Sequence, residues 1–407
     1  MSVLAKSWSA SSDPQRLLVG AAGLFLVALT LLHWGWYQHA LILDTIEYHR
    51  YGDAMVHGRL PYRDFPVEYP PGALPTFLLP AIGRPSTSLY NREFQILMAL
   101  CGVGALAAMW WALRSLGASI DRTAAALCFF ALAPLVLGSV ILYRYDLWPA
   151  ALTVAGLAAV LARRERLGFA AIGLGVAAKA FPAVVLPPAF VYVWRTRGRR
   201  EALVCLATSV AVAAFVVVPF LVLAPHGVWD SIVQQTTRPL QIESLGSAIL
   251  LALHHTVGLT VHWASSHGSQ NLVGSAPHAA GAISTALLLV SLLGIWLAAA
   301  RGPATPERLV RWTAASLAAF VAFDKVLSPQ FMIWLLPIVP LVAGRRGLIA
   351  SGLLALALLL TQIWFPIRYF DLVHFDAFPS WVLLARDLVL VALVVVLTAP
   401  ARAPARS

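Results

Sequence analysis

Carboxylates and lysines beside long apolar runs are the residues of this 407-residue sequence best suited to chemistry. Asp44 follows the first apolar run, and a carboxylate in such a place can accept a proton from a reacting hydroxyl group. Lys179 and Lys325 are two of only three lysines, and each lies at the end of an apolar segment with a proline close behind it. Ionisable groups are costly there, so both are candidates for a function such as neutralising an anion.

Each of these residues also has a plain structural interpretation. Asp44 and Glu47 have the spacing of a capping box, in which both side chains bond to N–H groups at the start of a helix. Lys179 and Lys325 can lie along apolar surface and place their ammonium groups among lipid headgroups. The residues alone leave both interpretations open.

Further polar candidates gather between the apolar runs. Asp146 follows Arg144 and could pair with it, pair with a neighbouring helix, or bind a ligand. The other candidates fall in three segments: Glu68 and Tyr69 before two prolines, Arg238, Gln241 and Glu243 in a later polar stretch, and Gln330 after Lys325 and Ser328-Pro329. Surface-loop, rigid-turn and headgroup roles compete with ligand binding at these positions. His374 suits either a substrate contact or a membrane-interface role.

Metal and cofactor sites are not predicted. Five histidines lie between residues 254 and 278, but His254 and His255 are adjacent instead of having the i, i+4 spacing that metal sites on helices favour. The three cysteines, Cys101, Cys128 and Cys205, all lie inside apolar runs, which indicates packing instead of disulfides or metal ligands.

The elements that must position these residues are membrane-spanning helices. The chain is 60% hydrophobic and 12% charged, against roughly 25% charged residues in a soluble domain. Many apolar runs approach the ~20 residues that a spanning helix needs. We therefore predict an all-α integral membrane protein with about twelve spanning segments, at about residues 17–36, 94–113, 123–142, 147–162, 167–178, 181–194, 202–224, 279–300, 309–323, 330–343, 347–365 and 380–399. The run 17–36 is too long for a signal peptide, so we expect a retained helix.

Charge placement predicts the orientation. One side of the predicted membrane carries 18 basic and 5 acidic residues, and the other carries 11 basic and 13 acidic. The positive-inside rule makes the first side cytoplasmic, with both termini on it. The net charge of +11 is then a topology signal for contact with membrane lipids, and nucleic-acid binding is not expected.

The predicted organisation is a single transmembrane domain at 17–399 between cytoplasmic tails at 1–16 and 400–407. Its long outer loops are 37–93, 225–278 and 366–379, and long loops in compact proteins usually carry function. Residues 44–57 suit an amphipathic surface helix, 73–82 is too short to span, and 246–261 suits a re-entrant or surface helix. The short segments 167–178 and 181–194 suggest a hairpin with Lys179 at its tip.

Four motifs, taken in order, resemble glycosyltransferase family 87 of the GT-C superfamily, the polyprenyl-phosphate-mannose-dependent mannosyltransferases of actinobacteria. They are Asp44 after the first span, Gly58-x-x-Pro61-Tyr62 leading to Glu68-Tyr69-Pro70-Pro71, Arg238-x-x-Gln241-x-Glu243-Ser244, and Lys325-x-x-Ser328-Pro329-Gln330. The resemblance implies a GT-C fold, a lipid-linked sugar donor and metal-independent, inverting transfer on the outer face of the plasma membrane. It leaves the acceptor, a lipid or a glycan, undefined.

This implication assigns a role to each candidate. Asp44 becomes the general base, because a phosphate leaving group needs no general acid and one carboxylate suffices for the acceptor hydroxyl. Lys179, Lys325 and Arg238 become donor-phosphate ligands, because cations must neutralise the phosphate. The candidates for sugar or acceptor binding are Glu68, Tyr69, Asp146, Gln241, Glu243, Gln330 and His374.

Two other functions compete with mannose transfer. The same scaffold could transfer another polyprenyl-phosphate sugar, arabinofuranose or glucose. Twelve spans with both termini inside also describe secondary transporters, but those usually have matching halves and short outer loops. Here the halves differ and the outer loops are long.

Overall fold

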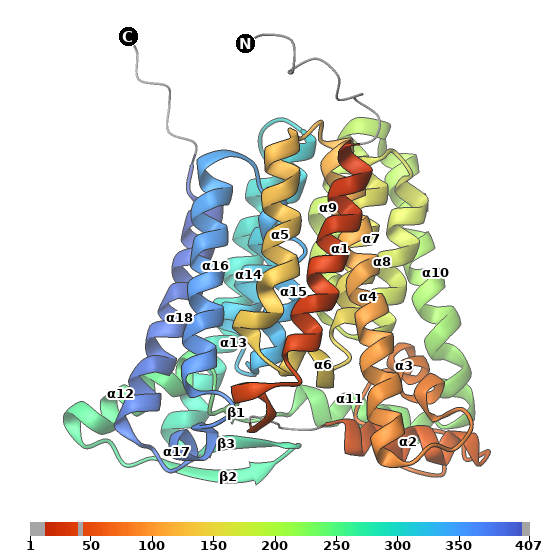
Figure 1. Ribbon diagram of the computed structural model, residues 1–407. Coiled ribbons are helices and arrows are strands. Elements are labelled where there is room, and N and C mark those ends of the chain that lie inside the picture. The colour runs from red at the N-terminus through yellow and green to blue at the C-terminus, as the bar shows by residue number, and fades with distance from the viewer. Residues whose placement is uncertain (1–12, 40–43, 401–407) are drawn as a thin grey trace.

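The computed structural model describes residues 13–39 and 44–400, in which helices run side by side between two ends of a bundle (Figure 1). Six helices are long and apolar enough to cross a membrane: α4 (Thr87–Ser115), α5 (Ile120–Leu137), α10 (Arg199–Leu223), α13 (Ser275–Ala300), α16 (Gly344–Trp364) and α18 (Ala377–Thr398). The shorter helices of the bundle are α1 (Asp13–Leu31), α7 (Leu147–Leu161), α8 (Glu165–Ala178), α9 (Leu186–Arg197) and α14 (Pro306–Phe323). The chain is thus a multi-pass membrane protein, and the count of twelve spans stays a prediction.

Local sequence explains where the long helices begin and end. The side chains of Ser86, Ser119 and Thr305 accept hydrogen bonds from backbone N–H groups at the starts of α4, α5 and α14. Gly138, with φ of +76°, ends α5 before the short α6 (Val140–Tyr143). The predicted span 123–142 is therefore two helices, because glycine readily adopts a conformation that stops the first.

The predicted span 330–343 is not one continuous helix. It consists of the 3-10 turn η5 (Pro329–Phe331), α15 (Met332–Leu335) and the 3-10 turn η6 (Val339–Leu341). Pro337 and Pro340 lack the N–H groups that would continue the helix, which accounts for the break. The segment is almost fully buried, so neighbouring helices cover the interrupted backbone.

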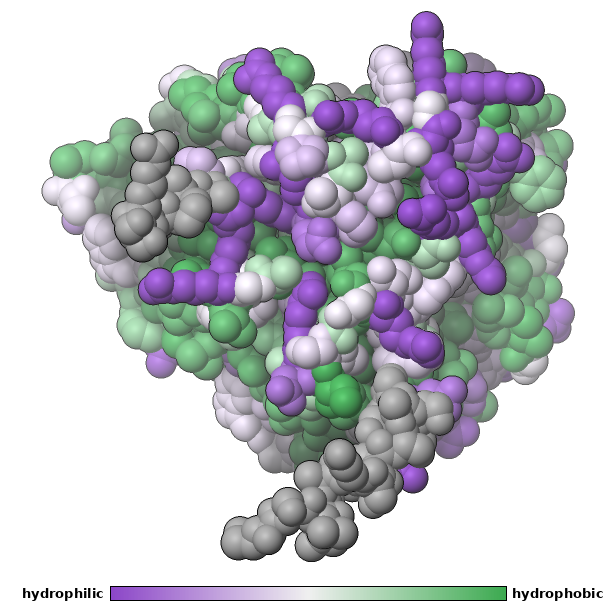
Figure 2. Space-filling model, turned by 90° about the horizontal axis from the view of Figure 1, so that it is seen from above, coloured by the Kyte–Doolittle hydropathy of each residue, from purple (hydrophilic) through white to green (hydrophobic). Residues whose placement is uncertain are grey.

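One end of the bundle holds the start of α1 and the end of α18 (Figure 1). Figure 2 shows that hydrophilic side chains gather on this end. Arginines lie at the ends of the helices there, among them Arg114, Arg166, Arg195, Arg301 and Arg346. Its assignment to the cytoplasm stays a prediction, and most of both predicted tails lies outside the described residues.

The opposite end carries short helices built from the loops (Figure 1). After the 3-10 turn η1 (Gly35–His39), the first loop forms α2 (Thr45–Val56), η2 (Pro71–Ala73), α3 (Leu74–Leu78) and η3 (Leu79–Ala81). The second forms α11 (Pro225–Thr236) and α12 (Leu245–Val257), and the last forms α17 (Tyr369–Val373). Helices are thus present where 44–57 and 246–261 were predicted to lie at the surface.

The fold is predominantly helical, as predicted, and it also contains one small sheet that was not predicted from the sequence. The second loop contains a three-stranded antiparallel sheet in the order β1-β3-β2, made of β1 (Leu240–Gln241), β2 (His262–Ser266) and β3 (Ser269–Val273). His267 and Gly268 join β2 to β3, both with positive φ, as in the two-residue turns that match the twist of a hairpin. The sequence predicts a long outer loop at 225–278 and no strands within it.

Two glycines let the loops pack closely on the bundle. A Cβ at Gly72 would lie 2.6 Å from the backbone of Ala177 at the end of α8. A Cβ at Gly227 in α11 would lie 1.8 Å from the carbonyl oxygen of Tyr62. The first loop is therefore wedged between α8 and the second loop, which fixes the walls of the cavity described next.

Candidate active site

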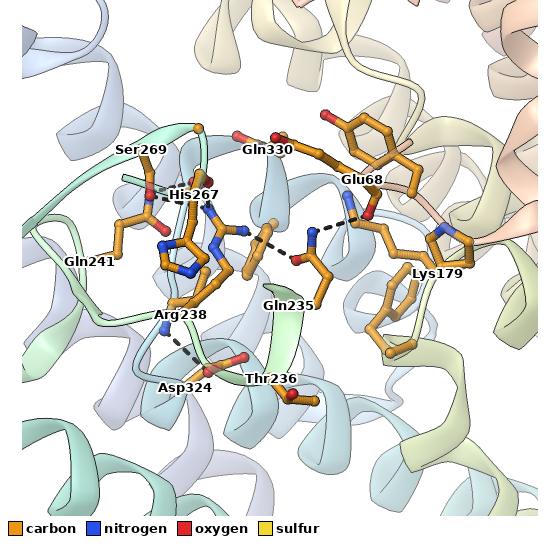
Figure 3. Close-up of a pocket in the computed structure, with 18 of the residues that line it drawn as sticks. Glu68, Lys179, Gln235, Thr236, Arg238, Gln241, His267, Ser269, Asp324 and Gln330 are labelled. Atoms are coloured by element: carbon orange, nitrogen blue, oxygen red, sulfur yellow. Dashed lines mark hydrogen bonds between the residues drawn. The ribbon is translucent and has the colours of Figure 1, made fainter. Parts of the chain in front are cut away.

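A cavity of about 1000 Å³ lies among these loops at the end of the bundle opposite the arginine-rich end. Its walls come from the first loop, the segment before α7, the tip after α8, the second loop, the segment after α14, and α17. Figure 3 shows residues of the first loop, the tip after α8, the second loop and the segment after α14 around the cavity. Eight charged residues line it: Asp44, Glu68, Glu243 and Asp324, and Arg144, Lys179, Arg238 and Lys325. A wall with equal numbers of cations and carboxylates can bind an anion and move a proton in one place.

Asp44 lies at the start of α2, but its side chain does not cap the helix. The backbone carbonyl of Asp44 accepts the first helical hydrogen bonds, from the N–H groups of Glu47 and Tyr48. The carboxylate forms an ion pair with Arg144, which lies between α6 and α7. The capping-box interpretation is therefore wrong for this side chain, and Asp44 faces the cavity.

Lys179 lies at the tip between α8 and the 3-10 turn η4 (Phe181–Val185), and its ammonium group is held from several sides. Nζ lies 2.7 Å from Oδ1 of Asp146, which is 1% exposed. The rings of Tyr145 and Trp334 lie 4.7 and 5.2 Å from Nζ, within reach of a cation–π attraction. The Trp334 indole also donates to Asp146 at 2.6 Å. Asp146 thus supports Lys179 from behind the cavity wall.

Arg238 follows α11 and reaches the turn of the β-hairpin. Its Nη2 donates to the carbonyl of His267 and to the hydroxyl of Ser269, each at 3.2 Å. Its Nη1 donates to Gln235 Oε1 at 3.4 Å, and the Gln235 amide donates to the carbonyl of Glu68 at 3.1 Å. Figure 3 shows Gln235 between Arg238 and Glu68. This amide joins the two long loops, and nothing in its sequence context pointed to it.

Glu68 and Tyr69 line the cavity from the first loop. Burial raises the pKa of the Glu68 carboxyl, although Arg238 opposes the shift. The Tyr69 ring packs edge-on against Tyr48 and Tyr145, with centroids 5.6 and 5.2 Å away. The aromatic cluster holds Tyr69 in place, so Glu68 beside it is presented from a rigid support.

Gln241 and Glu243 are almost fully buried at the back of the cavity. The Gln241 amide donates to Glu243 and, at 2.7 Å, to the Ser328 hydroxyl. Among the described residues, Gln241 Oε1 and Glu243 Oε1 have no hydrogen-bond partner. Burial raises the pKa of Glu243 to about 7. The pair therefore offers polar oxygens to a ligand that enters the cavity.

A fully buried arginine of α18 lies behind this pair. Arg386 donates from Nη2 to the Glu243 carbonyl at 2.6 Å and forms an ion pair with Asp387. Both side chains are at most 1% exposed. Sequence reasoning missed them, although two adjacent charges inside a predicted span are a recognised signal of a structural or functional site.

Lys325 and Asp324 are adjacent but do different things. Lys325 Nζ donates to the carbonyl of Thr236 at 3.2 Å, whereas Asp324 accepts from the backbone N–H of Val326 at 3.1 Å. Burial raises the pKa of Asp324 to about 6. The backbone N–H of Val326 thus holds the Asp324 carboxylate in place. Gln330 lines the same wall from η5.

The structure brings nine of the eleven predicted residues to the cavity: Asp44, Glu68, Tyr69, Lys179, Arg238, Gln241, Glu243, Lys325 and Gln330. Asp146 lies behind the wall, bonded to Lys179. His374 is exposed, and its ring lies 6.4 Å from that of Trp263, outside the cavity lining. Among residues 13–39 and 44–400, no group of three or more His, Cys, Asp or Glu side chains could hold a metal ion.

The cavity also has an apolar wall. Ala213 and Val217 of α10, Leu288 of α13 and Phe320 of α14 line it. Only 6% of the most apolar stretch of α10 is buried, and Phe215 on this helix is 82% exposed. The helix therefore faces lipid on one side and the cavity on another, so an apolar chain from the membrane would find a matching surface.

Comparisons with known proteins give a family and a similar fold. A family model described as glycosyltransferase family 87 matches residues 67–329. The crystal structure of ArnT from Cupriavidus metallidurans bound to undecaprenyl phosphate is similar, with 15% identity and a TM-score of 0.50 over 96% of this chain and 77% of that one. The apo structure of the same protein gives 14% identity and a TM-score of 0.48 over 96% and 78%. The search of curated proteins gave no significant match.

Proposed function

Because the chain belongs to glycosyltransferase family 87, we propose that it transfers a sugar from a polyprenyl-phosphate donor to a lipid or glycan acceptor. Mannose is the first candidate for the sugar, from the four motifs that resemble the mannosyltransferases. The observation that carries the proposal is the cavity, where Lys179, Arg238 and Lys325 share one space with Asp44 and an apolar wall.

The proposed class of donor follows from the polar and the apolar parts of the cavity wall. A phosphate group carries negative charge that cations must balance, and three cations beside Arg144 line the polar part. An isoprenoid chain needs apolar surface, which α10 and α13 supply. ArnT, which has a similar fold, was crystallised with undecaprenyl phosphate. A polyprenyl phosphate combines both requirements in one molecule.

The reaction needs one proton acceptor. The acceptor hydroxyl oxygen attacks the anomeric carbon, the bond from that carbon to the phosphate oxygen breaks, and its electron pair stays on the phosphate. The hydroxyl proton goes to the Asp44 carboxylate, a step that typically contributes ~10²–10⁴-fold to the rate. Attack from the face opposite the leaving phosphate inverts the anomeric configuration.

Polar groups around the cavity bind the sugar and the acceptor in this proposal. The Gln241 and Glu243 oxygens that lack partners among the described residues suit sugar hydroxyl groups. Glu68, Tyr69 and Gln330 lie on the facing walls. Asp146 acts through Lys179, and His374, which lies away from the cavity, has no contact role in this step.

The outer face of the plasma membrane is the proposed site of the reaction. The cavity lies at the end of the bundle away from the arginine-rich end, which the positive-inside rule assigns to the cytoplasm. Nucleotide sugars do not cross lipid, so a transferase on the outer side needs a donor that is itself in the membrane. Labelling of single cysteines introduced between residues 45 and 85 in intact cells tests this orientation. If they are labelled only after the membrane is permeabilised, the cavity faces the cytoplasm and the proposed orientation is wrong.

The decisive experiment is transfer by the purified full-length protein. It is supplied with a short-chain polyprenyl-phosphate mannose and with lipid and glycan acceptors, and the released polyprenyl phosphate is measured. Arabinofuranose and glucose donors run in parallel, since a preference for either would replace mannose. Consumption of no donor under any of these conditions would refute the transferase proposal.

A further inference from the structure

The candidate base and an arginine that no motif singled out are paired in the cavity. Asp44 and Arg144 come from α2 and from the segment before α7, so the pair joins two distant parts of the chain. The side chains are 27% and 14% exposed, and both line the cavity. The pair is thus open to a molecule that enters.

The neighbouring ion pair on the same segment is different. Asp146, two residues after Arg144, is 1% exposed and accepts from both Lys179 and Trp334. The Trp334 indole therefore helps to hold the Asp146 carboxylate on Lys179, behind the cavity wall. Both cations line the cavity, but of the two carboxylates only Asp44 does, so Asp44–Arg144 is the pair that an anion in the cavity can separate.

A carboxylate in an ion pair with arginine is a poor base. The guanidinium stabilises the charged form of the acid and occupies its lone pairs, so proton transfer to it becomes less favourable. The pair must loosen before Asp44 can take the acceptor proton. The donor phosphate is the anion that can replace the carboxylate, because a guanidinium binds phosphate oxygens with the same planar geometry.

We propose that Arg144 is a donor-phosphate ligand that blocks Asp44 until the donor binds. On binding, the guanidinium moves from the Asp44 carboxylate to the phosphate, and the freed carboxylate can accept the proton of the acceptor hydroxyl. The enzyme then binds donor before it can activate acceptor, which protects the base from unproductive encounters. This inference rests on the proposed function, in which Asp44 is the base and a polyprenyl phosphate is the donor.

The test is a double-mutant cycle on the binding of a short-chain polyprenyl phosphate without sugar. Full-length wild type, Arg144→Gln, Asp44→Asn and the double variant are compared in detergent by tryptophan fluorescence. Arg144→Gln should weaken binding roughly tenfold or more, since a hydrogen bond to a charged group is lost. Asp44→Asn should tighten binding about threefold or more, because Arg144 no longer has to leave a partner.

The double variant distinguishes movement of Arg144 from Asp44 to the phosphate from the simple effect of removing a negative charge from the cavity. If Arg144 moves between partners, Asp44→Asn tightens binding only when Arg144 is present. Equal tightening in the Arg144→Gln background, or no tightening in either, would overturn the proposal. Glu68→Gln is the matched control, since it removes another cavity carboxylate and should change affinity equally in both backgrounds.

Two measurements keep this result separate from the proposed function. Wild-type binding of the polyprenyl phosphate is measured first, and its absence would refute the donor class itself. Arg144→Lys keeps the charge without the planar fork and should bind between wild type and Arg144→Gln. If Arg144→Lys binds the polyprenyl phosphate as weakly as Arg144→Gln does, and its thermal stability is unchanged, the result still supports a guanidinium ligand. If both variants bind it with wild-type affinity, Arg144 is not a ligand of the phosphate.

Discussion

Lys179 and Asp146 form a buried ion pair in which Nζ lies 2.7 Å from Oδ1, and the Trp334 indole donates to the same oxygen. The lysine comes from the tip after α8 and the aspartate from the start of α7. One face of the ammonium group is bound by Asp146, and the residue still lines the cavity. The pair thus serves both the stability of the fold and the charge of the site.

Asp146→Asn should destabilise the protein by about 3 kcal/mol, because removal of one partner leaves a buried charge without compensation. Thermal unfolding in detergent measures the change. The double variant Asp146→Asn with Lys179→Met should recover part of the loss. If the double variant is less stable than Asp146→Asn, the unpaired charge of Lys179 is not the cause of the lost stability.

Asp44→Asn should lower the turnover of sugar transfer by ~10²–10⁴-fold while the donor binds at least as tightly as to wild type. The amide keeps the shape of the side chain and loses the capacity to accept a proton. Asp53→Asn on the same helix is the control, because Asp53 is half exposed and faces His57 at the surface. Turnover of Asp44→Asn equal to that of Asp53→Asn would exclude Asp44 as the base.

Lys325→Met should weaken donor binding by roughly tenfold, the usual scale for a hydrogen bond to a charged group. The ammonium group touches a single carbonyl, that of Thr236, among the described residues, so it remains available to a phosphate. Lys325→Arg should retain most of the affinity. An unchanged dissociation constant for Lys325→Met would assign this lysine to lipid headgroups instead.

Glu243 should make stability depend on pH. Burial raises the pKa of this carboxyl from its ordinary value of 4.5 to about 7. Between these values the unfolded chain has lost the proton that the folded chain keeps, so stability falls as pH rises from 4.5 to 7 and levels off above. Melting curves of wild type and Glu243→Gln test this, and the variant should show a flatter profile over that window. Parallel profiles would mean that Glu243 is ionised in the fold.

Arg386→Met should severely destabilise the protein, by about 3–5 kcal/mol, since it leaves the buried Asp387 unpaired. The double variant Arg386→Met with Asp387→Leu should unfold at a higher temperature than Arg386→Met. Reduced transfer in a folded double variant would further show that the bond from Arg386 to the Glu243 carbonyl positions the cavity wall. Wild-type transfer in that variant would make the role of Arg386 one of stability alone.

Periodicity, charge and motifs predicted much of this layout. Apolar runs located the long helices, and the two short runs around Lys179 do form helices with that residue between them. Nine of the eleven chosen residues line one cavity although they are spread over nearly 300 positions. The motif order was informative because loops on one side of a membrane share a small space.

The partners of the charged residues could not be predicted in the same way. The sequence left open whether Asp146 pairs with Arg144, pairs with a neighbouring helix or binds a ligand; in the structure Asp146 pairs with Lys179 and Arg144 pairs with Asp44. Which ions meet depends on how the loops pack, and no local pattern encodes it. The β-hairpin was missed because its turn, His267-Gly268, lies in a stretch that is polar throughout and has little strand periodicity.

Arg386 on α18 donates to the backbone carbonyl of Glu243, which lies 143 positions earlier in the sequence. During synthesis, the wall that carries Gln241 and Glu243 therefore waits without this support until the final helix enters the membrane. A chain that ends early has the carboxylates and lysines but an unbraced pocket. Insertion of α18 and completion of this wall are in this way the same event.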